Sequence, residues 1–155
     1  MKLFDNDDAL NHYFQALDRR LVVPVSQHTP LLANLDIVDN ISLIREAHEH
    51  MPTKRARALA QDALDSLGYG HIAHLRSVEC SVRERFVAQL IRASMMQYAK
   101  IVIIRPFVML HDTEDIHMLL ECLGKLKGHC DCTILDMESN RSKYEAGGAA
   151  CRIIG

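Results

Sequence analysis

The feature that most constrains the fold is an unbroken run of Ile and Val over residues 101–104, entered by Lys100 and closed by Arg105 and Pro106. The run carries no polar position on either face, which is typical of a short strand buried on both sides in the middle of a parallel sheet. Helical patterns precede and follow it. We therefore expect an α/β protein organised around this strand.

The segments on both sides of the run alternate between helical and strand patterns. Helices are expected over residues 8–20, about 34–47, 53–67, 81–95 and 112–128, and further strands over residues 21–25, 133–135 and 150–154. Gly68 suits a helix C-cap. Ser81 and Glu84 have the spacing of a capping box. This order predicts a small, mainly parallel sheet with flanking helices.

Composition limits the class of protein. A chain of 155 residues is expected to form one domain, and its 18 basic against 20 acidic residues indicate neither a nucleic acid nor an acidic lipid surface as partner. The five cysteines are irregularly spaced and follow no secretory signal pattern, so a cytoplasmic location is expected. No apolar run approaches the roughly 18 residues needed to span a bilayer.

Histidine and cysteine occur in close pairs that raise the question of a metal site. The pairs are His48 with His50, His71 with His74, and Cys130 with Cys132. None has the doubled spacing of a strong metal motif. Solvated turn histidines and ordinary buried thiols are expected instead, with no bound metal.

Three stretches resemble motifs of one family, in the same order. They are VSQHTPLLANLDIVDNI at residues 25–41, LGYGHIAH at residues 67–74, and the apolar run before Pro106. On these stretches, and over about residues 20–140, the chain resembles the second half of an ABC-transporter ATPase, the nucleotide-binding cassette that drives transport. The resemblance implies a helical-subdomain-like region at about 28–97 and a Walker-B/H-loop-like core at 98–155, both within a single domain of residues 1–155.

The motif residues that match the family are mostly altered. Gln27 keeps the identity of the Q-loop glutamine. In the signature motif Ser81 and Glu84 remain, but Val82 and Arg83 replace two glycines. The family's glycines let the backbone approach a nucleotide phosphate, and two bulky side chains would block that approach.

The positions that serve hydrolysis in the family also differ. Ile104 stands where the Mg²⁺-associated Asp belongs, and Arg105 where the catalytic Glu belongs. His111 falls at the D-loop Asp and Ser139 at the H-loop His. A neutral and a cationic side chain can neither hold the metal nor activate water. The resemblance therefore implies a degenerate nucleotide-binding domain without catalytic residues.

No G-x-x-x-x-G-K-[ST] motif occurs in the sequence, and few residues precede Gln27 to form a P-loop strand and its helix. The resemblance then implies that the Q-loop, Walker B and H-loop strands are adjacent and that the sheet edge where the P-loop strand normally sits is bare, to be covered by residues 150–154 or by a second protein. Two roles are open to Arg105: binding an anion, or pairing with Asp136 or Glu138. Pairing is favoured, because a buried charge needs a partner.

In the family, the helical subdomain contacts the membrane subunits. Leu31, Leu32, Ile37 and Val38 near its start are thus candidate docking residues. The first hypothesis is a non-catalytic protein without a cofactor that associates with a transporter membrane subunit, a true ATPase subunit or itself, and so lies at the inner face of a membrane. The alternative is an ATP-binding subunit that uses Mg²⁺ and ATP and supplies Gln27 to a composite site. A small-molecule-binding domain that uses the vacated cleft is a third hypothesis.

Overall fold

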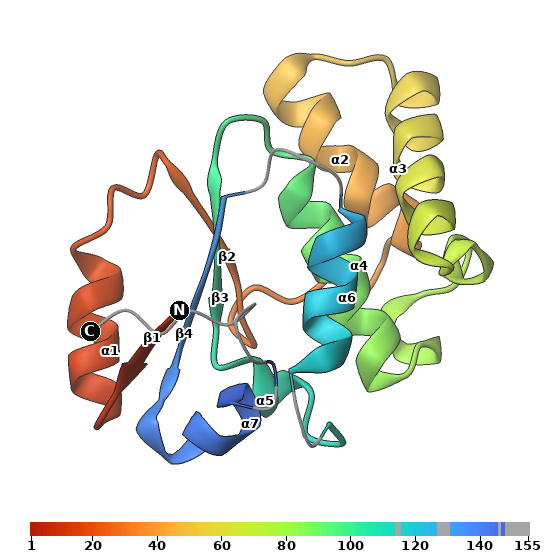
Figure 1. The fold of residues 1–155 in the computed structure, drawn as a ribbon. Coiled ribbons are helices and arrows are strands. Elements are labelled where there is room, and N and C mark those ends of the chain that lie inside the picture. The colour runs from red at the N-terminus through yellow and green to blue at the C-terminus, as the bar shows by residue number, and fades with distance from the viewer. Residues whose placement is uncertain (114–115, 127–130, 146, 148–155) are drawn as a thin grey trace.

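A four-stranded parallel sheet forms the centre of the computed structural model, which describes residues 1–113, 116–126, 131–145 and 147 (Figure 1). The strands follow the order β1-β4-β3-β2, and all pairs are parallel. Their bounds are β1 Lys2–Phe4, β2 Val22–Val25, β3 Lys100–Ile104 and β4 Cys132–Met137. The predicted small parallel α/β sheet is confirmed.

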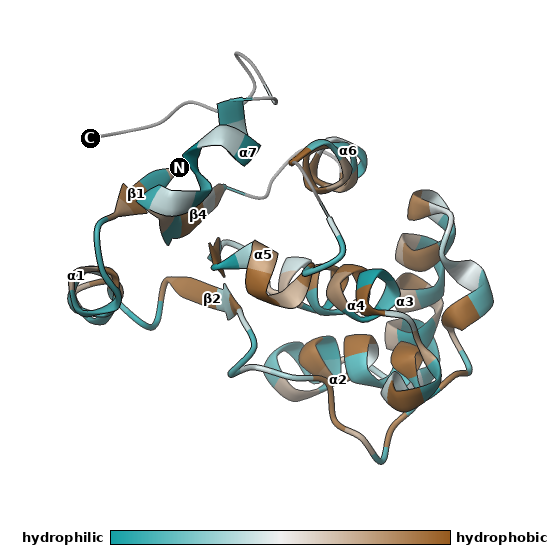
Figure 2. Ribbon diagram, turned by 90° about the horizontal axis from the view of Figure 1, so that it is seen from below, coloured by the Kyte–Doolittle hydropathy of each residue, from teal (hydrophilic) through white to brown (hydrophobic). Residues whose placement is uncertain are grey.

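Helices cover both faces of this sheet. The bounds are α1 Asp7–Gln15, α2 Ile37–Glu49, α3 Thr53–Leu67, α4 Val82–Ser94, α5 Pro106–Met109, α6 His117–Lys125 and α7 Arg141–Glu145. Helix α1 lies against one face, whereas α4 and α6 lie on the other side (Figure 2). Helices α2 and α3 pack on each other and on α4, farther from the sheet.

Strand β3 is buried on both faces, as the apolar run predicts. Ile101 and Ile103 join the larger core beneath α4 and α6. Val102 points to the opposite side and packs with Leu10 of α1 and Leu135 of β4. Because β2 and β4 pair with its two edges, β3 sits in the interior of the sheet.

Two helix ends also form as the sequence indicates. Ser81 Oγ accepts from the Glu84 N–H at 3.2 Å, and the Ser81 N–H donates to Glu84 Oε2 at 2.7 Å, which completes the capping box of α4. Gly68 adopts a left-handed conformation, with φ of 83°, after the end of α3. A side chain is strained in this conformation, so glycine suits the position.

Helix α1 is shorter than the pattern over residues 8–20 suggests. It ends at Gln15, and Asp18 then closes a local turn by accepting from both the backbone N–H and the guanidinium of Arg20. These contacts compete with continuation of the helix, as short acidic side chains commonly do.

The expectation of a bare sheet edge is wrong. Strand β1 pairs with β4, with Lys2 opposite Leu135 and Phe4 opposite Met137. Only Asp5 and Asn6 separate β1 from α1, so a strand and a helix do precede β2. A three-residue strand gives little periodic signal, which explains why the sequence pattern misses it. The expected strand at 150–154 lies outside the described residues.

The segment after β4 is held by a carboxylate that is not exposed at all. Asp136 accepts hydrogen bonds from the Tyr144 hydroxyl, the Asn140 amide and the Met137 N–H. The Tyr144 ring also packs edge-on against Phe107 of α5. The sequence pattern misses both α5 and α7, and α6 begins at His117 instead of the expected residue 112.

Tyr144→Phe is expected to lower the free energy of unfolding by about 1.5–3 kcal/mol, because it removes a hydrogen bond to a buried carboxylate while keeping the ring. Urea unfolding followed by circular dichroism measures the change. Tyr13→Phe is the matched control, since the Tyr13 ring packs on Phe4 and no hydrogen bond of its hydroxyl is described. If both substitutions lowered the free energy of unfolding equally, the hydrogen bond from Tyr144 to Asp136 would not be what stabilises this segment.

Candidate functional site

A cleft of about 420 Å³ lies at the carboxyl ends of β2 and β3, between α1, α5 and the turn that follows β2. Ligands of open parallel α/β sheets characteristically bind at this edge. The lining comprises Asp7, Leu10, Asn11, Phe14, Gln15, Pro24, Ser26, Gln27, His28, Thr29, Ile104, Arg105 and Val108. We take this cleft as the candidate site.

The cleft has an apolar floor and a polar rim. The floor is built from Leu10, Phe14, Pro24, Ile104 and Val108, with Leu10 and Phe14 contributed by one face of α1. The rim carries three amide side chains and two ionised ones, Asn11, Gln15, Gln27, Asp7 and Arg105. A lining of this kind suits a molecule with an apolar body and a few polar groups.

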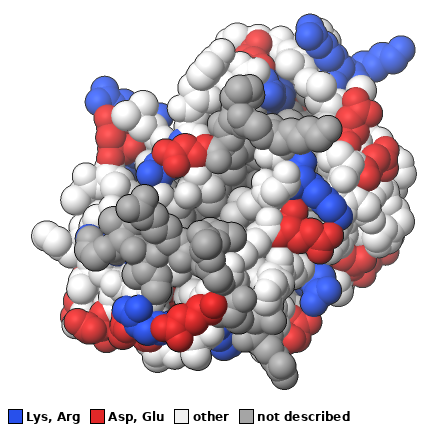
Figure 3. Space-filling model, in the orientation of Figure 1, with Lys and Arg blue, Asp and Glu red and all other residues white. Residues whose placement is uncertain are grey.

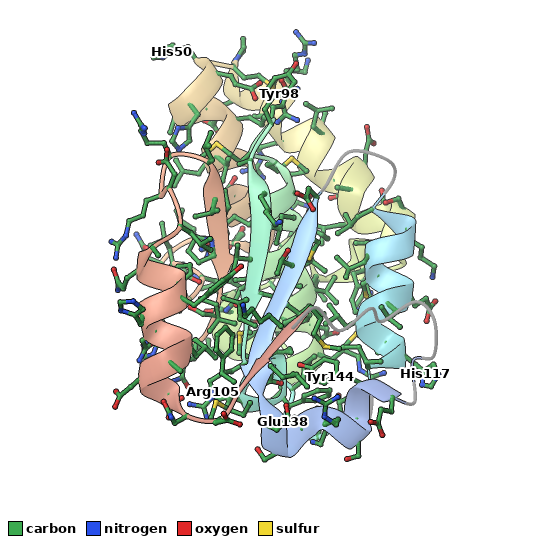
Figure 4. All side chains as sticks on the ribbon, turned by 60° about the vertical axis from the view of Figure 1, so that its left-hand side comes forward. His50, Tyr98, Arg105, His117, Glu138 and Tyr144 are labelled. Atoms are coloured by element: carbon green, nitrogen blue, oxygen red, sulfur yellow. The ribbon has the colours of Figure 1, made fainter. Side chains whose placement is uncertain are left out.

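Arg105 occupies an unusual backbone position at the end of β3. Its φ of 51° and ψ of 60° are left-handed, which is uncommon for a residue other than glycine. Its N–H still donates to the Leu135 carbonyl at 2.8 Å, and Pro106 then begins α5. This turn directs the guanidinium toward α1, at the lower end of the sheet in Figure 4.

The partner of Arg105 is not the expected one. Its Nη1 donates to Asp7 Oδ1 at 2.7 Å, from the first turn of α1. Asp136 is occupied by the contacts described above, and Glu138 pairs with Arg141. Only one N–H of Arg105 meets Asp7, and the buried Nε finds no acceptor among the described residues.

The turn that carries Gln27 is closed by local hydrogen bonds. Thr29 Oγ1 accepts from the Ser26 N–H at 3.1 Å, and the His28 N–H donates to Ser26 Oγ at 3.2 Å. Gln27 itself is exposed, with its Nε2 3.3 Å from His28 Nε2. The turn thus presents the Gln27 amide at the rim of the cleft.

Two side chains outside the cleft lining anchor the segment that follows. Arg92 of α4 donates to the carbonyls of Pro30, at 2.8 Å, and of Thr29, and its burial lowers the pKa of the guanidinium. Asn40 of α2 is 1% exposed and its amide bonds both the N–H and the carbonyl of Leu32. Together they fix the chain on the way from β2 to α2.

The structure brings together three of the sequence-predicted site residues. Gln27, Ile104 and Arg105 all line the cleft. The degenerate signature residues do not: Ser81 and Glu84 cap α4, Val82 packs against the larger core, and Arg83 is exposed. His111 and Ser139 are exposed and lie outside the lining.

The predicted docking residues are mostly unavailable to a partner in this structure. Leu31, Ile37 and Val38 are buried in the larger core, at 7%, 0% and 2% exposure. They are needed there because α2 has to pack on α3 and α4. Leu32 is 46% exposed, so its side chain is open to a partner.

Sequence reasoning did not single out Asp7, Arg92 or Asn40. An available signal for Asn40 is its position between Val38 and Ile41, a polar residue on an otherwise apolar helix face. Asp7 and Arg92 carry no such signal, because each acts on a segment remote in sequence.

Metal and thiol chemistry receive no support from the described part of the chain. Within it, no three His, Cys, Asp or Glu side chains gather in a way that could hold a metal ion. Burial raises the pKa of the Cys80 and Cys122 thiols, which makes them poorer nucleophiles. Cys130 lies outside the described residues.

Among the described residues, no helix has the length and apolar character to cross a bilayer.

Comparison with known proteins finds similarity by structure alone. No family model matches the chain, and no curated protein matches it by sequence. Solved structures do match. A dimeric ATP-binding cassette in a post-hydrolysis state, bound to ADP and phosphate, aligns with 90% of this chain at a TM-score of 0.59 and 17% identity. An inward-facing ABC transporter of the metal-chelate type aligns with 88% at a TM-score of 0.60 and 16% identity.

The chain has part of an ABC-ATPase fold. It covers 60% and 61% of the two matched chains, so it spans about three fifths of their length. At identities this low the structural match shows the fold alone. Whether this ABC-ATPase-like chain binds nucleotide or a partner has to be argued from its own residues.

Arg92→Met is expected to lower the free energy of unfolding by about 2–3 kcal/mol, because the carbonyls of Thr29 and Pro30 lose charge-assisted hydrogen bonds. Hydrogen exchange should become faster in residues 26–32 specifically. The control is Arg83→Met on the same helix, whose side chain is exposed. Unchanged exchange in 26–32 would show that Arg92 does not hold the turn.

Glu84→Gln is expected to change how stability depends on pH. Hydrogen bonds from Ser81 and then from His71 lower the pKa of Glu84, so the folded state favours the ionised carboxylate. That stability is present above the ordinary glutamate pKa of about 4.3 and is lost as pH falls through the lowered pKa. Chemical unfolding should show the variant less stable at pH 7, by up to about 1 kcal/mol, with the difference shrinking steadily as pH falls below the ordinary glutamate pKa. A difference that does not shrink as pH falls would contradict this cause.

Proposed function

We propose that this is a non-catalytic ABC-ATPase-like protein that acts by associating with another protein, as a regulator or scaffold of a transporter or of an ATPase subunit. The observation that carries the proposal is the Arg105–Asp7 ion pair at the carboxyl edge of the sheet. At this edge β3 ends in Ile104 and Arg105, neither of which binds a metal ion.

The first turn of α1 also disfavours a nucleotide. A helix N-terminus attracts phosphate through its free N–H groups. Here Asn6 caps the Ala9 N–H, and Asp7 and Asp8 place negative charge in the same turn. The carboxylates repel a polyphosphate, and Arg105 is already paired with one of them.

Support for association comes from large apolar side chains left exposed at the opposite end of the sheet. Tyr98, just before β3, is 96% exposed and has a left-handed φ of 63°, and Leu21, just before β2, is 60% exposed. Both line a second hollow beside Lys100 and Asp131. Exposed aromatic and apolar groups of this kind are typical of protein contacts. Charges of both signs are interspersed over the face seen in Figure 3.

Mg²⁺-ATP titrated into the purified chain in a calorimeter, up to about 5 mM, is expected to give no saturable heat, because β3 ends in Ile104 and Arg105 and the Asp7 and Asp8 carboxylates repel a polyphosphate. ATP hydrolysis should equal the buffer blank. Saturable binding would overturn the non-catalytic proposal, and Arg105→Gln would then test whether the phosphates lie in the cleft.

Adding a candidate ATPase subunit to the purified chain distinguishes the scaffold hypothesis from the hypothesis of a composite nucleotide site. If the chain is a scaffold, Gln27→Ala should leave co-elution and the partner's ATPase rate unchanged, whereas Tyr98→Ser combined with Leu21→Ser should abolish co-elution. ATPase activity that depends on Gln27 would instead support the alternative, in which the chain completes an ATP site in trans. Gln15→Ala, at the same cleft, is the matched control for Gln27.

A further inference from the structure

We propose that the cleft between α1, α5 and the turn after β2 binds a small zwitterion with an apolar side chain, an α-amino acid of the leucine or phenylalanine type. The carboxylate would lie on Arg105, the ammonium on Asp7, and the side chain on the apolar floor. This binding does not depend on protein association, and it goes beyond the proposed function.

The charge of the cleft selects the class of ligand. Asp7 and Arg105 carry opposite unit charges on one rim and lie in direct contact, so the lining offers one site of each sign and little net charge. A polyanion would gain one cation and meet a carboxylate beside it. A molecule that carries both charges a few ångströms apart can satisfy both groups at once.

Arg105 has unused hydrogen-bonding capacity for a carboxylate. A guanidinium carries five N–H donors, and the described contact with Asp7 engages only Nη1. Nε is buried, so it is closed to a ligand as well as lacking an acceptor among the described residues. The side chain as a whole is 36% exposed, so the Nη donors that Asp7 does not engage can reach a ligand in the cleft. Two parallel N–H contacts to a carboxylate are the geometry that arginine favours.

The left-handed backbone of Arg105 also points to a role at this position. A residue other than glycine is strained in this conformation, and the neighbouring structure has to offset that strain. The strain places the guanidinium at the rim beside Asp7, 98 residues away in sequence. A straight continuation of β3 would instead carry residue 105 along the sheet.

The floor and the size of the cleft define the rest of the ligand. Phe14, Pro24 and Val108 offer apolar surface next to the charged rim, and Val108 is 40% exposed. A volume of about 420 Å³ falls at the small end of ligand cavities, where it suits a compact molecule. The amides of Gln15 and Gln27 also line the cleft; Gln15 Oε1 accepts from Arg19 and Gln27 Nε2 pairs with His28, which leaves Gln15 Nε2 and Gln27 Oε1 for the ligand's remaining polar atoms.

The test is a titration of the 155-residue chain with L-phenylalanine and L-leucine, followed by nuclear magnetic resonance of ¹⁵N-labelled protein up to about 10 mM ligand. We expect saturable shifts at residues 7, 14, 27 and 105. Phenylpropionate, which lacks the ammonium, and phenethylamine, which lacks the carboxylate, should each bind about tenfold more weakly. Mg²⁺-ATP should not compete.

Matched variants identify the groups that bind. Arg105→Gln and Asp7→Asn should each weaken L-phenylalanine binding about tenfold or more. Arg141→Gln, which breaks an exposed ion pair outside the cleft, should leave it unchanged. Val108→Trp fills the floor while keeping the ion pair, so it should abolish binding even if the charge variants perturb folding. The proposal is overturned if no residue of the cleft shifts, or if both single-charge analogues bind as well as the amino acid.

Discussion

Burial of β3 on both faces is the constraint on which the rest of the structure depends. Both edges of the strand are paired, by β2 and β4, and its side chains enter a separate core on each side. Removing apolar surface from water stabilises the fold by about 25 cal/mol per Å². A strand whose two faces are both covered therefore stabilises the fold more than an edge strand of equal length. Any rearrangement of β3 would expose both cores. The position where the strand ends is therefore fixed, and so is the backbone of Arg105.

The ion pair follows from this fixed strand end together with the parallel topology. Parallel strands bring their carboxyl ends to one edge, so the connection after β1 and the residue after β3 meet although 98 residues separate Asp7 from Arg105. The left-handed turn at Arg105 directs its side chain across this edge. Because both charges are partly exposed, their pairing adds little stability, about 0–1 kcal/mol, and its main consequence is the charge pattern of the cleft.

Local patterns in the sequence predict the central elements well. The apolar run at 101–104, the capping box of Ser81 and Glu84, and Gly68 at the end of α3 each specify structure within a few residues. The ABC-ATPase resemblance, carried by short motifs, indicates the fold that solved structures then support. Elements of three to five residues, β1, α5 and α7, are too short to produce a period, and their formation depends on tertiary contacts.

The site is harder to predict because its geometry depends on long-range contacts. Pattern and resemblance single out Gln27, Ile104 and Arg105, and all three line the cleft, while their motif roles stay predictions. The partner of Arg105 could not be derived, since Asp7 belongs to a helix whose place opposite β3 is decided by the short strand β1. Burial likewise removes Ile37 from the candidate docking surface, because hydrophobicity alone does not distinguish a core residue from a contact residue.

The anchors of the Gln27 turn determine how far the cleft is organised before anything enters it. A buried polar side chain destabilises a fold unless its hydrogen bonds are made. Arg92 and Asn40 make theirs to backbone atoms of residues 29–36, so each can be satisfied only while that segment keeps its position. The turn is thereby tied to α4 and α2, which are packed in the larger core. One wall of the cleft is therefore rigid without a ligand, and the ordering penalty of binding falls mainly on the Asp7 and Arg105 side chains.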